Sequence, residues 1–129
     1  MFELAPADVD EIRRQFPELR LLVLHGSRAR GDAHSGSDWD FAYQAESSLD
    51  ELALRAVLAD RLRTDKLDVL DLDRAGGLVR YRAARDGKAV FERGTGEFER
   101  FRLEAVRFWL DAAPVIRAGY AHVLESVDR

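Results

Sequence analysis

The stretch over residues 24–40 constrains what this chain can fold into more than any other part of it. An apolar run ends there in a Gly26-Ser27 turn, a polar loop follows, and the loop leads to two aspartates one residue apart, Asp38 and Asp40. In an extended segment, alternate side chains project from the same face, so these two carboxylates would lie together on one face of a strand. The sequence therefore predicts a phosphate-binding turn that faces a metal site.

Composition limits the kind of protein this can be. With 129 residues, the chain has the usual size of a single domain with a modest core. Its net charge of −4 argues against a general affinity for nucleic acid or for an anionic membrane. The absence of cysteine excludes a disulfide framework and a thiolate metal site. No apolar run approaches the roughly 18 residues of a membrane span, and the N-terminus lacks the layout of a signal peptide, so we expect a cytoplasmic protein without membrane contact.

Hydrophobic periodicity and turn residues divide the chain into helices and strands. The first strand is a near-continuous apolar run, which is typical of a strand covered on both faces. In the second strand, the aspartates share one face and aromatic residues occupy the other, so one face would carry chemistry and the other would join the core. The predicted helices cover residues 6–16, 48–63, 75–85 and 96–127, and the predicted strands cover residues 19–24, 38–43, 66–72 and 88–92, with a loop over residues 28–36 that has room for a helical turn at its start.

The helix that follows the second strand has a capping pattern at its start. Ser48, or Ser47, would cap the helix, and Glu51 three residues further on would complete the reciprocal pair. Helical spacing then selects the buried side, which would consist of Leu49, Leu52, Ala56 and either Leu58 or Ala59.

The last predicted helix has an unusually broad apolar surface. A second line of apolar residues, Leu103, Val106 and Leu110, lies beside the main one, and together they exceed what packing on a small domain needs. The surface is either the core-facing side of a terminal helix or a partner-binding surface, and the sequence leaves both open. Pro114 is expected to kink the helix. The main line consists of Phe98, Phe101, Ala105, Phe108, Ala112, Ile116, Tyr120 and Val123.

Further candidate residues extend the site. Asp68 and Asp71 point to opposite faces of the third predicted strand, and a carboxylate on a buried strand is costly unless it is paired or metal-bound. At least one of them is therefore expected to have a role. Gly26 would let the backbone approach a phosphate closely, and Ser27 adds a hydroxyl beside turn amides. Aspartates also supply the hard oxygen ligands that magnesium prefers.

The spacing of these features is more specific than any one of them. The pattern resembles the signature of the DNA polymerase β-like nucleotidyltransferase superfamily: Gly26-Ser27, then ten residues, then Asp38-Trp39-Asp40, with a later aspartate on a strand. The sequence is most similar to its minimal, MNT-type members, the antitoxins of HEPN/MNT toxin–antitoxin pairs. Their motif, glycine-serine-x-alanine-arginine-glycine before serine-aspartate-x-aspartate, is matched over residues 26–31 and 37–40.

The resemblance implies a fold. We expect an α+β protein with a small mixed β-sheet, helices packed on it, and a long C-terminal helix. The minimal nucleotidyltransferase core would span residues 1–94. Residues 95–129 would form the helix that packs on this core and contacts a partner, within one domain overall.

The resemblance also implies residue roles. Paired aspartates would hold two Mg²⁺ ions that bridge the triphosphate of ATP, and a third strand carboxylate would help to hold the ion that activates the attacking hydroxyl. The glycine-serine turn would hold the β- and γ-phosphates, where a nearby arginine would neutralise charge. The implied catalytic residues and metal ligands are Asp38, Asp40 and Asp68, and the implied nucleotide-binding residues are Gly26, Ser27 and Arg28.

Asp71 and Arg30 have simpler explanations than a role in this site. Asp71 lies nearer the end of its strand, where it would cap the next helix, so Asp68 is the preferred third carboxylate. Arg30 is expected to be a surface ion-pair partner, and Asp32 a hydrogen-bonding loop residue. His25, at a strand end, is expected to be packed or hydrogen-bonded, and the remaining histidines, His34 and His122, form no visible metal cluster with it.

The leading function is that of an antitoxin enzyme. It would transfer AMP from ATP to a tyrosine hydroxyl of a cognate HEPN toxin, with which it would form a hetero-oligomer. Two alternatives stay open. One is a nucleotidyltransferase with a small-molecule acceptor, although the chain ends before the large acceptor-binding domain that such enzymes usually carry. The other is an antitoxin that acts mainly by binding and occlusion, through the apolar helix after Phe98.

Overall fold

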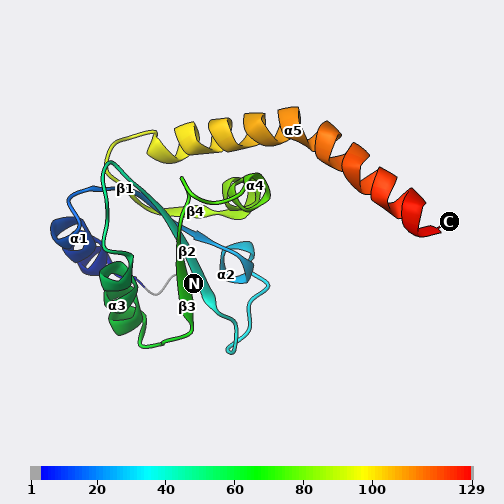
Figure 1. Ribbon diagram of the computed structural model, residues 1–129. Coiled ribbons are helices and arrows are strands. Elements are labelled where there is room, and N and C mark those ends of the chain that lie inside the picture. Colours follow the sequence, from blue (N-terminus) through cyan, green and yellow to red (C-terminus); the bar gives the residue numbers. More distant parts are fainter. Residues whose placement is uncertain (1–3, 129) are drawn as a thin grey trace.

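Four strands and five helices make up the part of the chain that the computed structural model describes, which is the backbone of residues 4–128 and the side chains of residues 4–112 (Figure 1). Every predicted helix and strand is present, and α2 supplies the helical turn at the start of the loop. The helices are α1 (Pro6–Gln15), α2 (Ser27–Arg30), α3 (Glu51–Leu62), α4 (Gly77–Asp86) and α5 (Glu97–Asp128). The strands are β1 (Leu19–His25), β2 (Trp39–Ala45), β3 (Leu67–Asp71) and β4 (Lys88–Glu92).

The strands form one mixed sheet in the order β3-β2-β1-β4. β1 is antiparallel to both β2 and β4, whereas β2 and β3 are parallel. A parallel pair needs a crossover connection, and α3 provides it. The predicted α+β fold, with a mixed sheet and a long C-terminal helix, is confirmed.

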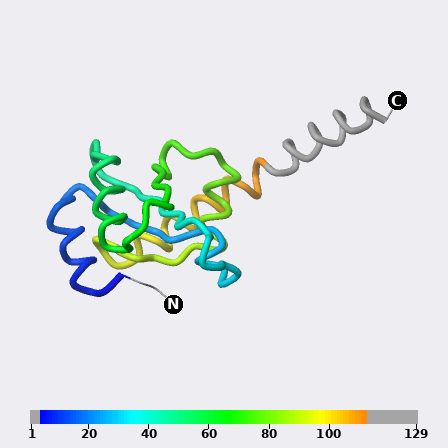
Figure 2. The backbone as a smooth tube through the Cα atoms, turned by 90° about the horizontal axis from the view of Figure 1, so that it is seen from below, coloured from blue at the N-terminus to red at the C-terminus, as the bar shows by residue number. Residues whose placement is uncertain are grey.

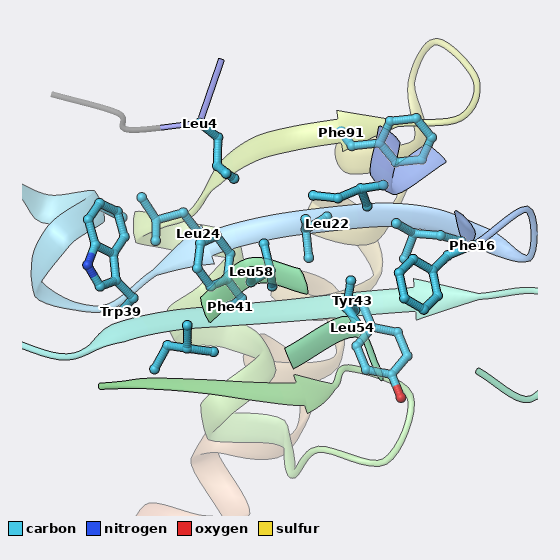
Figure 3. Packing of buried hydrophobic residues seen from close by; sticks show 14 residues of the cluster. Leu4, Phe16, Leu22, Leu24, Trp39, Phe41, Tyr43, Leu54, Leu58 and Phe91 are labelled. Carbon is cyan, nitrogen blue, oxygen red and sulfur yellow. The ribbon is translucent and has the colours of Figure 1, made fainter. Parts of the chain in front are cut away.

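Helices cover both faces of the sheet, as the apolar run of β1 predicts. Leu22 and Leu24 of β1 join a core cluster with residues of α1 and α3 (Figure 3). Leu21 and Val23 join a second cluster with residues of α4 and α5 on the other face. All four side chains are at most 2% exposed, so this strand is buried from both sides.

The face of β2 that carries Asp40 is only partly polar. Further along the same face, Ala42 is fully buried in the cluster under α4 and α5. Gln44 is 7% exposed, and its Nε2 donates to Oδ1 of Asp73 at 3.0 Å. The prediction of a purely chemical face therefore holds only at the start of the strand, and the site shares its face of the sheet with α4 and α5.

The start of α3 differs from the predicted one. Asp50 is the N-cap, and its Oδ1 accepts from the backbone N–H of Ala53 at 3.0 Å, so neither Ser47 nor Ser48 caps this helix. The buried side differs in part from the predicted one, which included Leu58 but not Leu54. Leu54 and Leu58 are fully buried, whereas Leu52 is 79% exposed and Ala56 is also exposed. Leu49 still packs on the core, from the loop before the helix.

The long helix α5 is anchored at its beginning and packs along α4, as Figures 1 and 2 show. The N–H of Phe98 donates to Oε1 of Glu92 at 2.8 Å, and Arg20 donates twice to Oε2 of Glu97, at 2.9 and 3.1 Å. Phe101 and Ala105 are 1% exposed and join the core.

The predicted second apolar line of α5 lies largely outside the core. Leu103 is 57% exposed and Leu110 64% exposed, and Phe108 of the main line is 57% exposed. The predicted kink at Pro114, the later members of the main line (Ile116, Tyr120 and Val123) and His122 lie outside the described side chains. Over the residues described, no helix combines the length and apolar character that a membrane crossing requires.

Candidate active site

The turn between β1 and α2 brings backbone against an acidic side chain. Gly26 has φ +72° and ψ −159°, in a region that side-chain-bearing residues rarely adopt. A Cβ atom at this position would collide with Oδ2 of Asp40. Helix α2 starts at Ser27, and the first N–H groups of a helix have no partner inside it. The predicted phosphate-binding turn is thus in direct contact with Asp40.

The sheet register brings two of the predicted carboxylates together. Asp40 of β2 is the register partner of Asp68 on the parallel strand β3, which places both side chains on the same face. Asp38 lies one residue before β2, two positions from Asp40. Asp40 is half-buried, whereas Asp38 and Asp68 are exposed.

The exposure of Asp68 corrects one step of the sequence argument. The cost of burying a carboxylate does not apply to Asp68, because β3 is an edge strand of the sheet and this side chain reaches solvent. What distinguishes Asp68 is its place beside Asp40, which follows from the parallel register of β3 with β2.

Electrostatics suit this carboxylate set to a divalent cation. The pKa of Asp40 is raised above its ordinary value, chiefly by burial, and the negative charges of Asp68 and Asp38 raise it further, while His25 and Arg30 act in the opposite direction. A cation would relieve this repulsion, and carboxylate oxygens are the hard ligands that Mg²⁺ prefers. Across the described part of the chain, no three acidic or histidine side chains are already arranged as a finished metal site.

Asp71 is placed away from this set. It is the register partner of Tyr43 and lies on the opposite face of β3 from Asp68. Its Oδ1 accepts from the N–H of Asp73 at 2.9 Å, which closes the turn after the strand. The N-cap of α4 is Gly76, so the predicted capping of the next helix by Asp71 is wrong.

The two arginines of α2 have different contacts. Arg28 donates from Nε and Nη2 to the carbonyl oxygen of Ser37, at 3.2 and 2.9 Å, and its guanidinium lies 4.2 Å from the ring centroid of Trp39. The guanidinium of Arg28 thus holds the loop before Asp38, and its predicted role in nucleotide binding stays a prediction. Arg30 pairs with Asp32 at 3.2 Å, as predicted for both residues.

His25 is packed beside the site. It is the register partner of Asp40 across β1 and β2, and its Nε2 is buried without a hydrogen-bond partner among the described residues. Burial lowers its pKa, while the charge of Asp40 and a hydrogen bond with the backbone of Phe41 oppose that shift. The expectation of a packed side chain is confirmed. Its proximity to Asp40 was missed, although the antiparallel pairing of consecutive strands could have revealed it.

His34 has a local role in the loop. Its Nδ1 accepts from the N–H of Gly36 at 3.0 Å.

Comparisons with known proteins place this geometry in a family. Residues 8–95 match the family described as Polymerase beta, Nucleotidyltransferase. The protein adenylyltransferase MntA of Aphanizomenon flos-aquae is 33% identical over 100 residues, which cover 68% of this chain and 67% of that protein. MntA of Shewanella oneidensis is 34% identical over 83 residues, covering 62% of this chain and 59% of that protein.

Solved structures share the fold over nearly the whole chain. One, from a toxin–antitoxin complex with AMP-PNP, has a TM-score of 0.74 at 24% identity and covers 98% of this chain and 100% of that chain. Another, from a complex of the tri-AMPylated Shewanella oneidensis HEPN toxin with its MNT antitoxin, has a TM-score of 0.65 at 22% identity and covers 95% and 98%. At these identities the likeness establishes the fold.

Proposed function

This chain belongs to the Polymerase beta, Nucleotidyltransferase family, and from that premise we propose that it transfers AMP from ATP to a tyrosine hydroxyl of a HEPN-domain toxin. The transfer would neutralise the toxin, so the protein would act as an antitoxin enzyme. Its relatives named protein adenylyltransferase support the reaction class, and the complexes of similar fold support the kind of partner. We propose the cytoplasm as its compartment, since ATP is available there.

One juxtaposition in the structure supports this proposal most directly. The Gly26 turn contacts Asp40, and Asp40 lies in register with Asp68. A site for nucleotidyl transfer needs a place for a triphosphate beside a set of carboxylates, and this arrangement supplies both. We assign the β- and γ-phosphates to Gly26 and Ser27, where backbone N–H groups at a turn favour an anion.

The carboxylates are the proposed metal ligands. Asp38, Asp40 and Asp68 would hold Mg²⁺ as a two-ion set, which fits their oxygen chemistry and the mutual repulsion at Asp40. When bound, such ions neutralise charge at the α-phosphate and on the pyrophosphate leaving group. The turn at Gly26 would hold the triphosphate beside Asp40 and so orient it relative to the carboxylates.

We propose a division of labour along the chain. Residues 1–94 form the nucleotidyltransferase core, and residues 95–129 form the helix that contacts the toxin in a hetero-oligomer. The exposed apolar side chains Leu103 and Leu110 support this, because they leave part of α5 unused by the core. Asp40 and α5 also occupy the same face of the sheet, so a toxin held on α5 would lie on the side of the site.

Mass spectrometry tests the proposal. The purified protein is incubated with ATP, Mg²⁺ and a cognate HEPN toxin, and the intact toxin is weighed for added AMP. The Asp38→Asn/Asp40→Asn variant should lower the transfer rate by at least about 100-fold, the order lost when a charge-stabilising group is removed. Its thermal unfolding temperature should not fall, because burial and like charges disfavour the ionised form of Asp40 and asparagine is neutral. A toxin that gains no AMP from the wild-type protein contradicts the proposal.

The occlusion alternative is separated by a growth assay. Cells that express the toxin are protected by the wild-type protein, and the same double variant is compared with it. Loss of protection at equal expression supports catalysis. Full protection by a variant without transferase activity favours neutralisation by binding.

A further inference from the structure

An arginine from α2 holds the backbone just before Asp38. Arg28 donates twice to the carbonyl oxygen of Ser37, at 3.2 and 2.9 Å, and its Nη2 also reaches the carbonyl oxygen of His34 at 3.4 Å. Its guanidinium lies over the ring of Trp39, on the other side of Asp38 in the chain. This half-buried side chain therefore contacts the residues on both sides of a proposed metal ligand.

A second arginine, from α3, makes the same pattern of contacts just before Asp68. Arg55 donates from Nε and Nη2 to the carbonyl oxygen of Leu67, at 3.1 and 2.9 Å, and its Nη2 reaches the carbonyl oxygen of Asp65 at 3.4 Å. In both cases the planar guanidinium grips the carbonyl of the residue that directly precedes the aspartate, which means that Nε and Nη2 both donate to that oxygen. Nη2 also reaches the carbonyl of a residue two or three positions earlier.

The two aspartates that follow the gripped carbonyls are those whose backbone the sheet fixes least. Asp40 lies in β2, which has a strand on each side. Asp38 precedes β2, and Asp68 lies on the edge strand β3, so each lacks part of the ladder that fixes Asp40. The N–H of Trp39 donates to the carbonyl oxygen of Lys66 at 2.9 Å, which links the two gripped segments.

We propose that Arg28 and Arg55 are positioning residues for the metal ligands Asp38 and Asp68, a role that rests on the proposed function. Each fork fixes the backbone from which a carboxylate projects, so that the carboxylate meets a cation without first losing conformational freedom. Arg28 thus acts on the carboxylate set through Ser37, and it does not serve as a phosphate ligand.

Lysine substitutions separate positioning from charge. Lysine keeps the positive charge but loses the planar fork, so Arg28→Lys and Arg55→Lys preserve attraction to phosphate and remove the double grip on the carbonyl. Arg61→Lys is the matched control on α3, because Arg61 pairs with Glu11 and Asp8 of α1, away from the site. The probe is Mn²⁺, titrated into the full chain with AMP-PNP and followed by electron paramagnetic resonance.

Both lysine variants should weaken Mn²⁺ binding by about 10- to 100-fold, the range for residues that orient metal ligands. The loss should be larger for Arg28→Lys, because Arg28 is half-buried whereas Arg55 is exposed. The KM for ATP at saturating Mg²⁺ should stay at the wild-type value, and Arg61→Lys should resemble the wild type in every measurement. A raised KM for ATP with unchanged Mn²⁺ binding in Arg28→Lys would overturn the role given to Arg28 and return it to phosphate.

Amide hydrogen exchange of Trp39 provides a readout that needs no metal and no activity. Because this amide links the two gripped segments, its exchange should speed up in Arg28→Lys and Arg55→Lys but not in Arg61→Lys. If the wild-type protein binds Mn²⁺, and both lysine variants keep its Mn²⁺ binding and its Trp39 exchange rate, the positioning role is overturned and the proposed function is not. A wild-type protein that neither binds Mn²⁺ with AMP-PNP nor transfers AMP overturns the proposed function.

Discussion

At the scale of single residues, a missing side chain decides how closely the turn after β1 approaches Asp40. Gly26 combines a positive φ with a position where a Cβ would overlap the Asp40 carboxylate. Gly31, five residues later, also has a positive φ, of +86°, but has no atom within 4 Å of its would-be Cβ. The two glycines therefore separate backbone strain from contact with the site.

Alanine substitutions at these glycines should both destabilise the protein but should differ in their effect on activity. Gly31→Ala should lower the free energy of unfolding by about 1–2 kcal/mol, the cost of a left-handed alanine. Gly26→Ala should cost about 1–3 kcal/mol, because its φ of +72° and ψ of −159° lie in a region that is almost exclusive to glycine. Only Gly26→Ala should abolish AMP transfer, because its methyl group displaces a flexible carboxylate. Urea denaturation and the toxin mass assay measure the two effects. Equal activity in both variants would contradict the contact between the turn and Asp40.

At the scale of elements, the first residues of α3 show why a local pattern can select the wrong cap. Ser47, Ser48 and Asp50 are all good N-cap residues, and sequence alone ranks them closely. In the structure Asp50 is the N-cap, and the helix buries Leu54 and Leu58 in the core. Local sequence therefore ranks the cap candidates without deciding between them.

Replacing the cap should destabilise the protein, while replacing the predicted cap should not. Asp50→Ala removes the acceptor for the Ala53 N–H and should cost about 1 kcal/mol of unfolding free energy. Ser48→Ala should change stability by less than about 0.5 kcal/mol, as is usual for surface substitutions. Thermal or urea unfolding of the two variants checks this. A larger loss for Ser48→Ala than for Asp50→Ala would disprove the assignment.

At the scale of the whole molecule, α5 is divided between two uses. Phe101 and Ala105 close the core over one face of the sheet, while Leu103 and Leu110 stay exposed. The sequence left open whether the broad apolar surface faces the core or a partner. In the described residues the surface serves the core in part: Val106 of the second line packs against the core, whereas Leu103 and Leu110 of that line, and Phe108 of the main line, stay exposed.

The exposed line should matter for toxin binding and not for folding. Leu103→Asp/Leu110→Asp should change the free energy of unfolding by less than about 0.5 kcal/mol, because both side chains already face solvent. The same change should weaken binding of the HEPN toxin by at least about 10-fold, since each substitution would place a charge in an apolar interface. Calorimetric titration measures the affinity. Leu52→Asp, at an exposed position of α3, is the control, and this variant should bind the toxin with wild-type affinity.

Much of the site was visible in the sequence because its parts are local. The Gly26-Ser27 turn and the Asp38-Trp39-Asp40 motif each lie within a few residues, and the order of helices and strands follows from short-range periodicity and turn residues. The roles of these residues in catalysis and metal binding stay predictions. Exposure was harder to predict, as Asp68 and Leu52 show, because it depends on which strand lies at the sheet edge and on which side of a helix packs against the sheet.

The stretch over residues 24–40 by itself predicted the glycine-serine turn and the aspartate pair, since turn residues and alternating strand faces need no distant partner. Its resemblance to a family signature indicated nucleotidyl transfer, and periodicity along the whole chain predicted the order of elements. Only the tertiary structure decided that Asp68 faces Asp40 and that Arg28 and Arg55 grip the backbone before the two outer aspartates. The physical reason is that the register of β3 with β2 and the reach of Arg55 to Leu67 depend on how the crossover helix α3 packs against the sheet, whereas the reach of Arg28 to Ser37 depends on the path of the loop between α2 and β2. No local sequence pattern predicts which strands pair in which register or which carbonyl a distant arginine reaches.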